Sequence, residues 1–171
     1  IEMIKKKTLG KIFLADCSLI WSRNKKYYKI PWRGKYSSDG GVLTNQAIHL
    51  LDATIFIFGK VKKFTSILGF NKKKLEAEDL ASLSLLHENK IITNFKATTR
   101  ADQNYKSSMD VIGEKGRVIV EGVSLNILNY LTGNKVKRDK NNSEKFSETK
   151  GVFGGMGNGH LKILGEFLNK N

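Results

Sequence analysis

Short apolar segments separated by turn residues dominate the middle of the chain. Within them apolar and polar residues alternate, which is typical of strands with one buried face. The turns "HENK" and "GEKG" stand between neighbouring segments, so these strands are joined tightly and are expected to pair antiparallel. The predicted strands are Lys11–Ser22, Val61–Gly69, Leu80–His87, Ile91–Thr98, Ser108–Ile112, Arg117–Glu121 and Ser124–Leu131.

Two helices complete the predicted architecture. The first runs from Gly40 to Phe58 and stops at Gly59, and the second is an amphipathic segment from Leu161 to Leu168. The pattern predicts an α+β fold, with helices on one face of an open, predominantly antiparallel sheet. Apolar residues on both sides of segments such as Ile91–Thr98 predict that the other face meets a partner, so we expect a homo-oligomer.

The 171 residues suffice for one domain, residues 1–171, with a core of its own. The segment Asn134–Lys150 is polar and is expected to be a long excursion or a mobile loop. The chain starts without Met and runs directly into structure, so we expect it to be part of a longer protein.

Composition excludes several classes of protein. The single cysteine, Cys17, lies in an apolar run, which fits a buried thiol and rules out a disulfide framework or structural zinc. No apolar run is long enough to span a membrane, and the start lacks a signal peptide, so a cytoplasmic protein is expected. The net charge of +14 raises nucleic acid as an alternative partner. However, the charge is mostly lysine in scattered runs, which is more typical of a solvated surface.

The predicted helix carries three polar groups on one side. At 100° per residue, Asn45, His49 and Asp52 project within one narrow stripe, whereas the rest of the circumference is apolar. A helix of this kind is expected to be buried, so the polar groups need partners. They either form an internal network, His49 bonding to Asn45 or Asp52, or face a cleft in which His49 transfers protons and Asn45 orients a substrate.

A basic, aromatic loop, Arg23 to Asp39, precedes this helix. Long loops of this composition inside a compact domain are usually functional. Familiar catalytic signatures do not occur: there is no G-x-S-x-G, no P-loop, and no G-x-G-x-x-G between a strand and a helix. The chain is therefore not expected to bind a dinucleotide by itself.

The order "WSRNKKYYKIPWRGKYSSDGGVLTNQAIHLLDATIFIFG", followed by "EAEDLASLSLLHENKIITNFKATT" and "DVIGEKGRVIVEG", resembles the C-terminal domain of the Gfo/Idh/MocA oxidoreductases. The resemblance covers most of the chain from Gly10 onward. It implies the dihydrodipicolinate-reductase-like, or glyceraldehyde-3-phosphate-dehydrogenase-like, C-terminal domain fold. It also implies NAD or NADP as cofactor and a sugar or related polyol as substrate. The "YY…WRG…NQxxH" version is most similar to the branch that oxidises a UDP-sugar such as UDP-N-acetylglucosaminuronate for surface polysaccharide.

The resemblance also implies roles for individual residues. His49 matches the active-site histidine, and Asn45 matches a substrate-orienting position. Trp32 and Arg33 match a loop that closes over cofactor and substrate. Three further residues, Arg23, Tyr28 and Lys35, are expected to bind a carboxylate or phosphates, and His160 matches a glycine-histidine segment near the pocket. Asp52 is expected to support the helix, and no metal ligand is implied.

In the family a Rossmann domain precedes this domain and supplies the cofactor loop and a lysine in an E-K-P motif. Neither is present in this sequence. We therefore expect half of a two-domain enzyme, inactive by itself. The alternatives are a non-catalytic sugar-binding or oligomerisation domain of the same fold, and a basic nucleic-acid-binding module.

Overall fold

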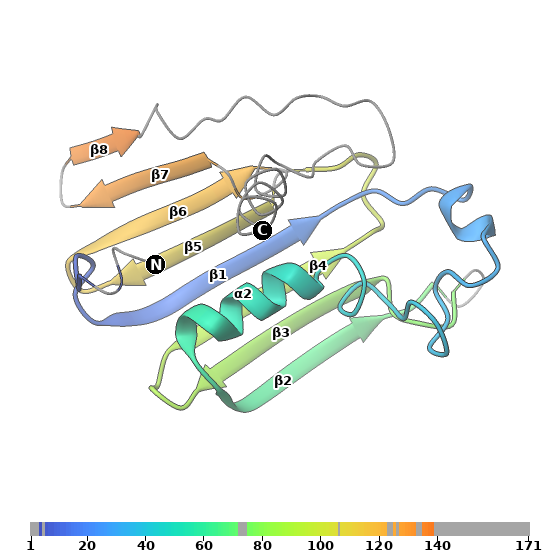
Figure 1. Ribbon diagram of the computed structural model, residues 1–171, viewed down its shortest axis with the longest axis horizontal. Helices are drawn as coiled ribbons and strands as arrows, with labels where there is room; N and C mark the ends of the chain where they lie inside the picture. Colours follow the sequence, from blue (N-terminus) through green and yellow to red (C-terminus); the bar gives the residue numbers. More distant parts are fainter. Residues whose placement is uncertain are drawn as a thin grey trace, which may run out of the picture.

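The strands join one open, eight-stranded sheet in the order β2-β3-β4-β1-β5-β6-β7-β8 (Figure 1). The computed structural model describes residues 4, 6–71, 75–105, 107–122, 125, 127–132 and 135–138. Its elements are β1 (Ile12–Ile20), the 3-10 helix η1 (Tyr27–Lys29), α2 (Ile48–Phe58), β2 (Val61–Gly69), β3 (Leu80–His87), β4 (Ile92–Thr98), β5 (Ser107–Gly113), β6 (Gly116–Gly122), β7 (Ile127–Thr132) and β8 (Lys135–Arg138).

Antiparallel pairing dominates the sheet, which confirms the predicted α+β class. Both predicted hairpin turns are present: the amide of His87 donates to the carbonyl of Ile91 at 2.9 Å, and Gly113 pairs with Gly116. The exception to the antiparallel pattern is β1, which runs parallel to β4. After β1 the chain passes through α2 to the edge strand β2. The antiparallel strands β2, β3 and β4 then lead back to β1, so that β4 lies beside β1 and parallel to it (Figure 1).

Most predicted strand boundaries agree with the structure. The bounds of β2 and β3 are those predicted, and β1, β4, β5 and β6 differ by no more than two residues at either end. The predicted polar excursion Asn134–Lys150 is wrong at its start, because Lys135–Arg138 form β8 and pair with β7. The second predicted helix and His160 lie outside the described residues.

The helix α2 begins eight residues later than predicted, at Ile48. Residues 40–47 form turns instead, in which the amide of Ala47 donates to the carbonyl of Val42 across five residues rather than four. Glu78, which precedes β3, stabilises this wide turn by two hydrogen bonds. Its carbonyl accepts one from the Val42 amide at 2.8 Å, and its carboxylate accepts one from the Leu43 amide at 3.1 Å. The helix ends at Gly59, as predicted, with φ +87°.

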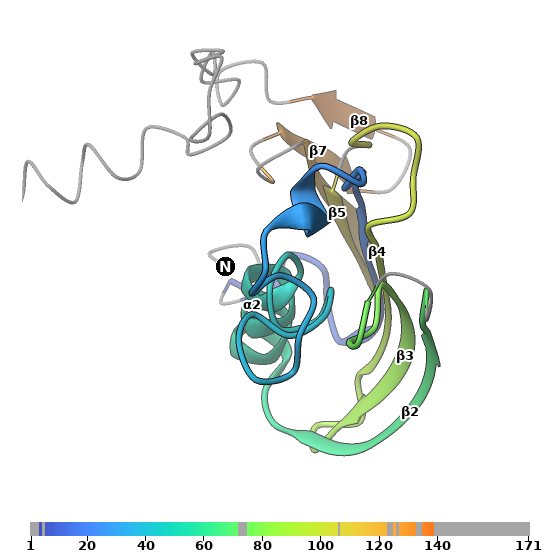
Figure 2. The same cartoon turned by 90° about the vertical axis from the view of Figure 1, so that its right-hand side faces the viewer.

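One face of α2 packs on the sheet over β1 (Figure 2). Leu50, Thr54 and Phe58, four residues apart, are the buried positions. The Thr54 hydroxyl donates to the Leu50 carbonyl at 2.7 Å and lies 3.4 Å from the Cys17 sulfur of β1. The expectation of a helix buried on nearly all sides is wrong, because its outward face exposes apolar side chains, with Phe56 74% exposed.

The core lies between α2 and the sheet. Alternate residues of the strands point into it, among them Cys17, Leu83 and Phe95. A buried histidine, His87, lies at the edge of this core. Its Nδ1 is 2.7 Å from the Gly59 carbonyl oxygen, and its Nε2 is 3.0 Å from the Thr93 hydroxyl. The ring therefore ties the end of α2 to β3 and β4.

The sheet face away from α2 carries rows of like side chains. In the register of the sheet, Leu86, Ile92, Leu14 and Ile112 form an apolar row across β3, β4, β1 and β5. The next row is polar, because the Ser84 hydroxyl donates to Asn94 at 3.2 Å and the Asn94 amide donates to Asp16 at 3.1 Å. The predicted second apolar side of β4 is thus limited to Ile92, which is followed by Asn94 and Lys96.

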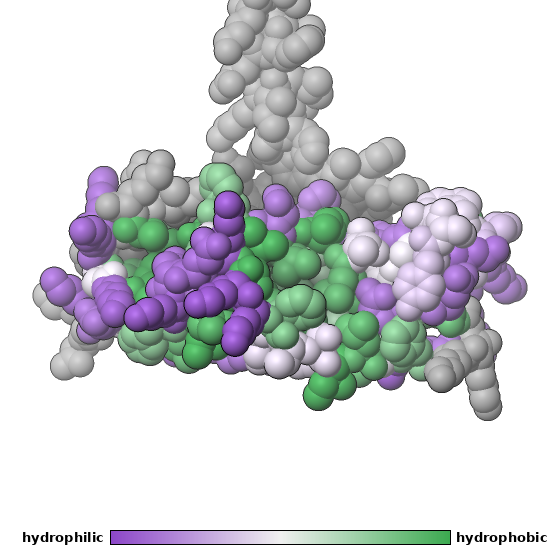
Figure 3. Space-filling view, turned by 90° about the horizontal axis from the view of Figure 1, so that it is seen from below, coloured by the Kyte–Doolittle hydropathy of each residue, from purple (hydrophilic) through white to green (hydrophobic). Residues whose placement is uncertain are grey.

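The edge strand β2 is exposed along most of its length. Phe64 and Ile67 leave 67% and 77% of their surface open, beside Lys62 and Lys63. Viewed from below, hydrophobic and hydrophilic side chains alternate along this side of the molecule (Figure 3).

Candidate functional site

The loop between β1 and α2 is held at its ends and in its middle by backbone hydrogen bonds. At its start, the amides of Trp21 and Arg23 donate to the carbonyls of Thr98 and Thr99, both at 2.9 Å. In its middle, the Gly34 carbonyl accepts from the amides of Glu76 and Ala77 at 3.1 and 3.0 Å. The loop is therefore fixed against the ends of β1 and β4 and against the β2–β3 connection.

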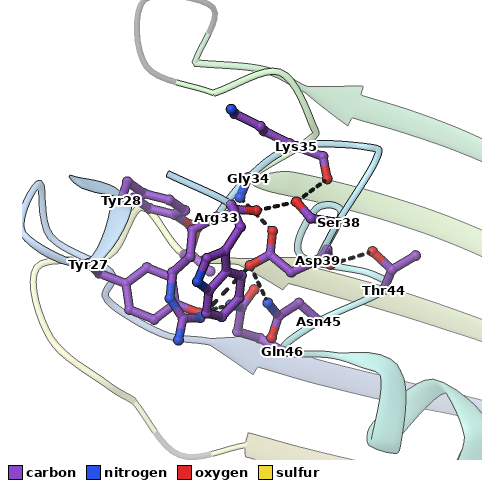
Figure 4. Close-up of polar contacts among 12 residues, drawn as sticks. Tyr27, Tyr28, Arg33, Gly34, Lys35, Ser38, Asp39, Thr44, Asn45 and Gln46 are labelled. Atoms are coloured by element: carbon purple, nitrogen blue, oxygen red, sulfur yellow. Dashed lines mark hydrogen bonds and ion pairs between the residues drawn. The ribbon is translucent and has the colours of Figure 1, made fainter. Parts of the chain in front are cut away.

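Asp39 organises the end of this loop (Figure 4). Its Oδ1 accepts from the Gly34 amide at 2.6 Å, and its Oδ2 accepts from the Asn45 side-chain amide at 2.8 Å. Arg33 lies 3.8 Å from the same Oδ2. Because its Nδ2 is held by Asp39, Asn45 has a fixed amide plane, and its Oδ1 is left to accept a hydrogen bond from a ligand.

Tyr27 forms a second centre beside Asp39 (Figure 4). Its hydroxyl accepts hydrogen bonds from the Arg33 guanidinium and, at 3.0 Å, from the Gln46 amide. The guanidinium carbon of Arg33 lies 3.9 Å from the centre of the Tyr27 ring and 4.3 Å from that of Trp32. Cation–π attraction therefore keeps the Arg33 head group between these aromatic side chains, and Trp32 itself is 48% exposed.

His49 lies in the first turn of α2, and its side chain is exposed. Neither hydrogen bond of the predicted internal network is present: within the described part of the chain, His49 bonds neither to Asn45 nor to Asp52, and Asn45 is bound to Asp39 instead. Asp52 is exposed as well. The polar side of this segment thus faces outward, where an exposed imidazole can exchange a proton with a bound molecule.

The structure separates the three residues expected to bind a carboxylate or phosphates. Arg23 and Tyr28 line one cavity of about 420 Å³ at the ends of β1 and β4, but Lys35 is not part of its lining. Lys35 is exposed, and Figure 4 shows its side chain directed away from Asp39. The Tyr28 hydroxyl lies 2.9 Å from that of Thr99, and burial raises the pKa of Tyr28, so the phenol stays neutral.

Several functional candidates were not identified from the sequence. Asp39 and Tyr27 were passed over, although an Asp directly before "GG" is a turn signal that draws attention to this position. The cavity also contains Lys25, Asn71 and Arg100, which follow three different segments of the sequence. No local pattern connects them, because the pairing of β1 with β4, and of β2 with β4 through β3, brings these segments to the same edge of the sheet.

Among the described residues, no three side chains of His, Cys, Asp and Glu gather into a metal-binding cluster. In the same part of the chain, no helix is long and apolar enough to cross a lipid bilayer. Of the residues expected to contact a nicotinamide cofactor, Trp32 offers an exposed aromatic face, and the buried Arg33 Nε–H has no hydrogen-bond partner among the residues that the structure describes. These two groups suit an aromatic ring and a hydrogen-bond acceptor, respectively.

Residues 1–119 match the sequence model of the GFO/IDH/MocA C-terminal domain. Among solved structures, the chain is similar to the WlbA dehydrogenase from Bordetella pertussis in complex with NADH and UDP-GlcNAcA, with 28% identity and a TM-score of 0.74. The match covers 82% of this chain and 41% of that one. The WlbA dehydrogenase from Chromobacterium violaceum, also in complex with NADH and UDP-GlcNAcA, gives 26% identity and a TM-score of 0.72 over 78% of this chain and 39% of that one.

Levoglucosan dehydrogenase in complex with NADH shares the fold, with 15% identity and a TM-score of 0.71 over 80% of this chain and 41% of the other. A comparison with curated protein sequences found no match. The chain thus spans about two fifths of the length of the solved relatives it matches.

Proposed function

Because the chain belongs to the GFO/IDH/MocA family, as its C-terminal domain, we propose that it is the substrate-binding part of an NAD(P)-dependent sugar-nucleotide dehydrogenase. The observation that carries the proposal is an exposed His49 next to an Asn45 whose amide is held in place by Asp39. The WlbA relatives, solved with NADH and UDP-GlcNAcA, support a UDP-sugar as the substrate class. The proposal places the reaction in the cytoplasm and in surface polysaccharide biosynthesis.

In this proposal the side chains of the loop and helix bind and orient the sugar. The Asn45 Oδ1 accepts a hydrogen bond from a sugar hydroxyl, and His49 takes the proton from the hydroxyl that is oxidised. Trp32 and Arg33 cover the site and exclude water from it. When bound, the nicotinamide would accept the hydride from the carbon that bears this hydroxyl, and its binding would depend on a nucleotide-binding domain outside this sequence.

The test compares two variants on the same helix, one of His49 and one of Asp52. In the protein that contains this chain together with a nucleotide-binding domain, NADH formation from UDP-GlcNAcA is followed at fixed pH. His49→Gln is expected to lower kcat by about 10²- to 10⁴-fold, the usual contribution of a positioned proton acceptor. Asp52→Asn, at another exposed position of α2, is the control and is expected to retain kcat within about twofold.

Equal kcat values for wild type and His49→Gln would refute the role of His49. The 171-residue chain alone is expected to form no NADH, since the hydride acceptor would have no site. Turnover by this chain without another domain would therefore contradict the division of labour that we propose.

We also propose that a second copy of the chain covers the sheet face away from α2. The support is the apolar row through Ile92, which is 46% exposed, and the exposed strand β2 with Ile67. Light scattering after size-exclusion chromatography is expected to give a multiple of the 19.2 kDa chain mass. Ile92→Arg is expected to yield monomers, and Lys11→Arg, at an exposed position outside the strands, is not. A monomeric wild type at high concentration would contradict this proposal.

A further inference from the structure

The cavity at the ends of β1 and β4 has a surplus of positive charge. Among the described residues, three cationic side chains line it, Arg23, Lys25 and Arg100, against a single carboxylate, Asp79. Arg100 is bound to this carboxylate: its Nε and Nη2 lie 2.9 and 2.5 Å from the Asp79 Oδ1. The hydrogen bonds that Arg100 donates to Asp79 raise the pKa of Arg100, so the guanidinium stays charged.

The other two cations have no acidic partner within the described residues. Arg23 donates to the Ser22 carbonyl at 2.8 Å and is steadied by the Trp21 ring, whose centre lies 5.0 Å from its guanidinium carbon. Lys25 is exposed at the cavity rim. One carboxylate balances one of the three cations, so the lining retains the charge of about two cations for a ligand.

The polar groups that remain available in the cavity are mainly donors. The Asn24 Oδ1 already accepts from the Tyr27 amide at 3.0 Å, which leaves its NH₂ group to donate. Arg100 is 40% exposed and keeps N–H groups that Asp79 does not use. Leu75, Ala101 and the Tyr28 ring supply an apolar side. A ligand that fits must therefore carry several acceptor oxygens and negative charge next to a less polar part.

The cavity adjoins the proposed sugar site through one residue, Gly34. A Cβ at this glycine would lie 2.7 Å from Leu75 Cδ2 and 3.6 Å from Tyr28 Cδ1, both residues of the cavity lining. The amide of Gly34 donates to Asp39, which holds Asn45. A molecule with its sugar at Asn45 thus has the cationic cavity as a direct neighbour.

We propose that this cavity binds the diphosphate of a nucleoside diphosphate sugar, with Arg23, Lys25 and Arg100 contacting the phosphoryl oxygens. The inference rests on the proposed function and specifies which part of the substrate is held here. A diphosphate diester carries one negative charge on each phosphoryl group, which matches the uncompensated charge of the lining. A volume of about 420 Å³ lies within the usual range of small-molecule sites and leaves room for the adjoining nucleoside.

The test measures binding of UDP to the 171-residue chain by titration calorimetry. Lys25→Gln and Arg23→Gln are each expected to weaken UDP binding by about tenfold or more, since each removes a charge-assisted hydrogen bond. Lys26→Gln is the matched control: it removes the same charge from the neighbouring residue, which does not line the cavity, and should change the affinity by less than about threefold. Inorganic pyrophosphate should compete with UDP.

Arg100→Gln leaves the buried Asp79 without its partner and can fail to fold, so the decision rests on Arg23 and Lys25. Unchanged UDP affinity in both variants, or an equal loss in Lys26→Gln, would overturn the assignment of the cavity. No UDP binding by the wild-type chain at millimolar ligand would overturn it too. The proposed dehydrogenase function would survive any of these results if the complete protein still oxidises UDP-GlcNAcA in a His49-dependent manner.

Discussion

The ionisation of the Cys17 thiol reports on the packing of α2 against the sheet. Burial raises its pKa from 9.0 to about 11, against the opposing effect of the Thr54 hydrogen bond. In the unfolded chain the thiol has its ordinary value. Between pH 9 and about 11, therefore, the unfolded chain loses a proton that the folded chain keeps, and the free energy of unfolding must fall as the pH rises.

The magnitude follows from the two pKa values. Below about pH 9 both states hold the proton, so the contribution of Cys17 to stability is fully present. At pH 10 the unfolded thiol is mostly ionised and the folded thiol mostly protonated. This difference of about one proton over one pH unit lowers the free energy of unfolding by about 1.4 kcal/mol relative to pH 7.5.

Urea unfolding at pH 7.5 and pH 10, followed by circular dichroism, isolates this term when wild type is compared with Cys17→Ala. Lysine and tyrosine titrations contribute equally to both proteins, so the wild type should lose about 1.4 kcal/mol more than the variant. Reaction of native wild type with a thiol reagent at pH 8 should be slow and limited by unfolding. Equal pH dependence in the two proteins, or rapid thiol reaction in the native state, would refute this account of the α2–β1 packing.

Three further substitutions test contacts that fix the loop and the sheet, each by urea unfolding. His87→Ala should lower the free energy of unfolding by about 2–4 kcal/mol, because it opens a cavity and leaves the Gly59 carbonyl and Thr93 hydroxyl unpaired; a loss below about 1 kcal/mol would contradict this. Gly41→Ala should cost about 1–3 kcal/mol, since a Cβ there would overlap the buried Glu78 carboxylate, and a neutral result would show that Glu78 can move aside. Arg100→Gln should cost about 1–3 kcal/mol, and adding Asp79→Asn should recover part of this loss; additive losses would show that the two side chains do not interact.

The sequence allowed the strands to be predicted because their signals are local. Alternation within β2 or β3 and the turns "HENK" and "GEKG" depend on neighbouring residues alone. The predicted start of α2 was wrong because Glu78, 36 residues after Val42, holds the turn before the helix by two hydrogen bonds. A contact of this kind leaves no mark in the periodicity of either segment.

The candidate site was predictable to the same extent. Asn45, His49, Trp32 and Arg33 stand on one continuous segment, in which Asp39 contacts both Asn45 and Arg33. The cavity could not be predicted, because Arg23 follows β1, Asn71 follows β2 and Arg100 follows β4. Their proximity depends on the order of strands in the sheet, which single-strand patterns do not encode.

The central position of β1 also constrains the order in which the protein can assemble. Its partners β4 and β5 begin at Ile92 and Ser107, so β1 has neither neighbour until synthesis of the chain has passed Ile92. The hairpins β3–β4 and β5–β6 close over short turns and can form before β1 joins them. We therefore expect the insertion of β1 between these two hairpins to be slow, and until it occurs the apolar residues of β1 are open to association with other chains.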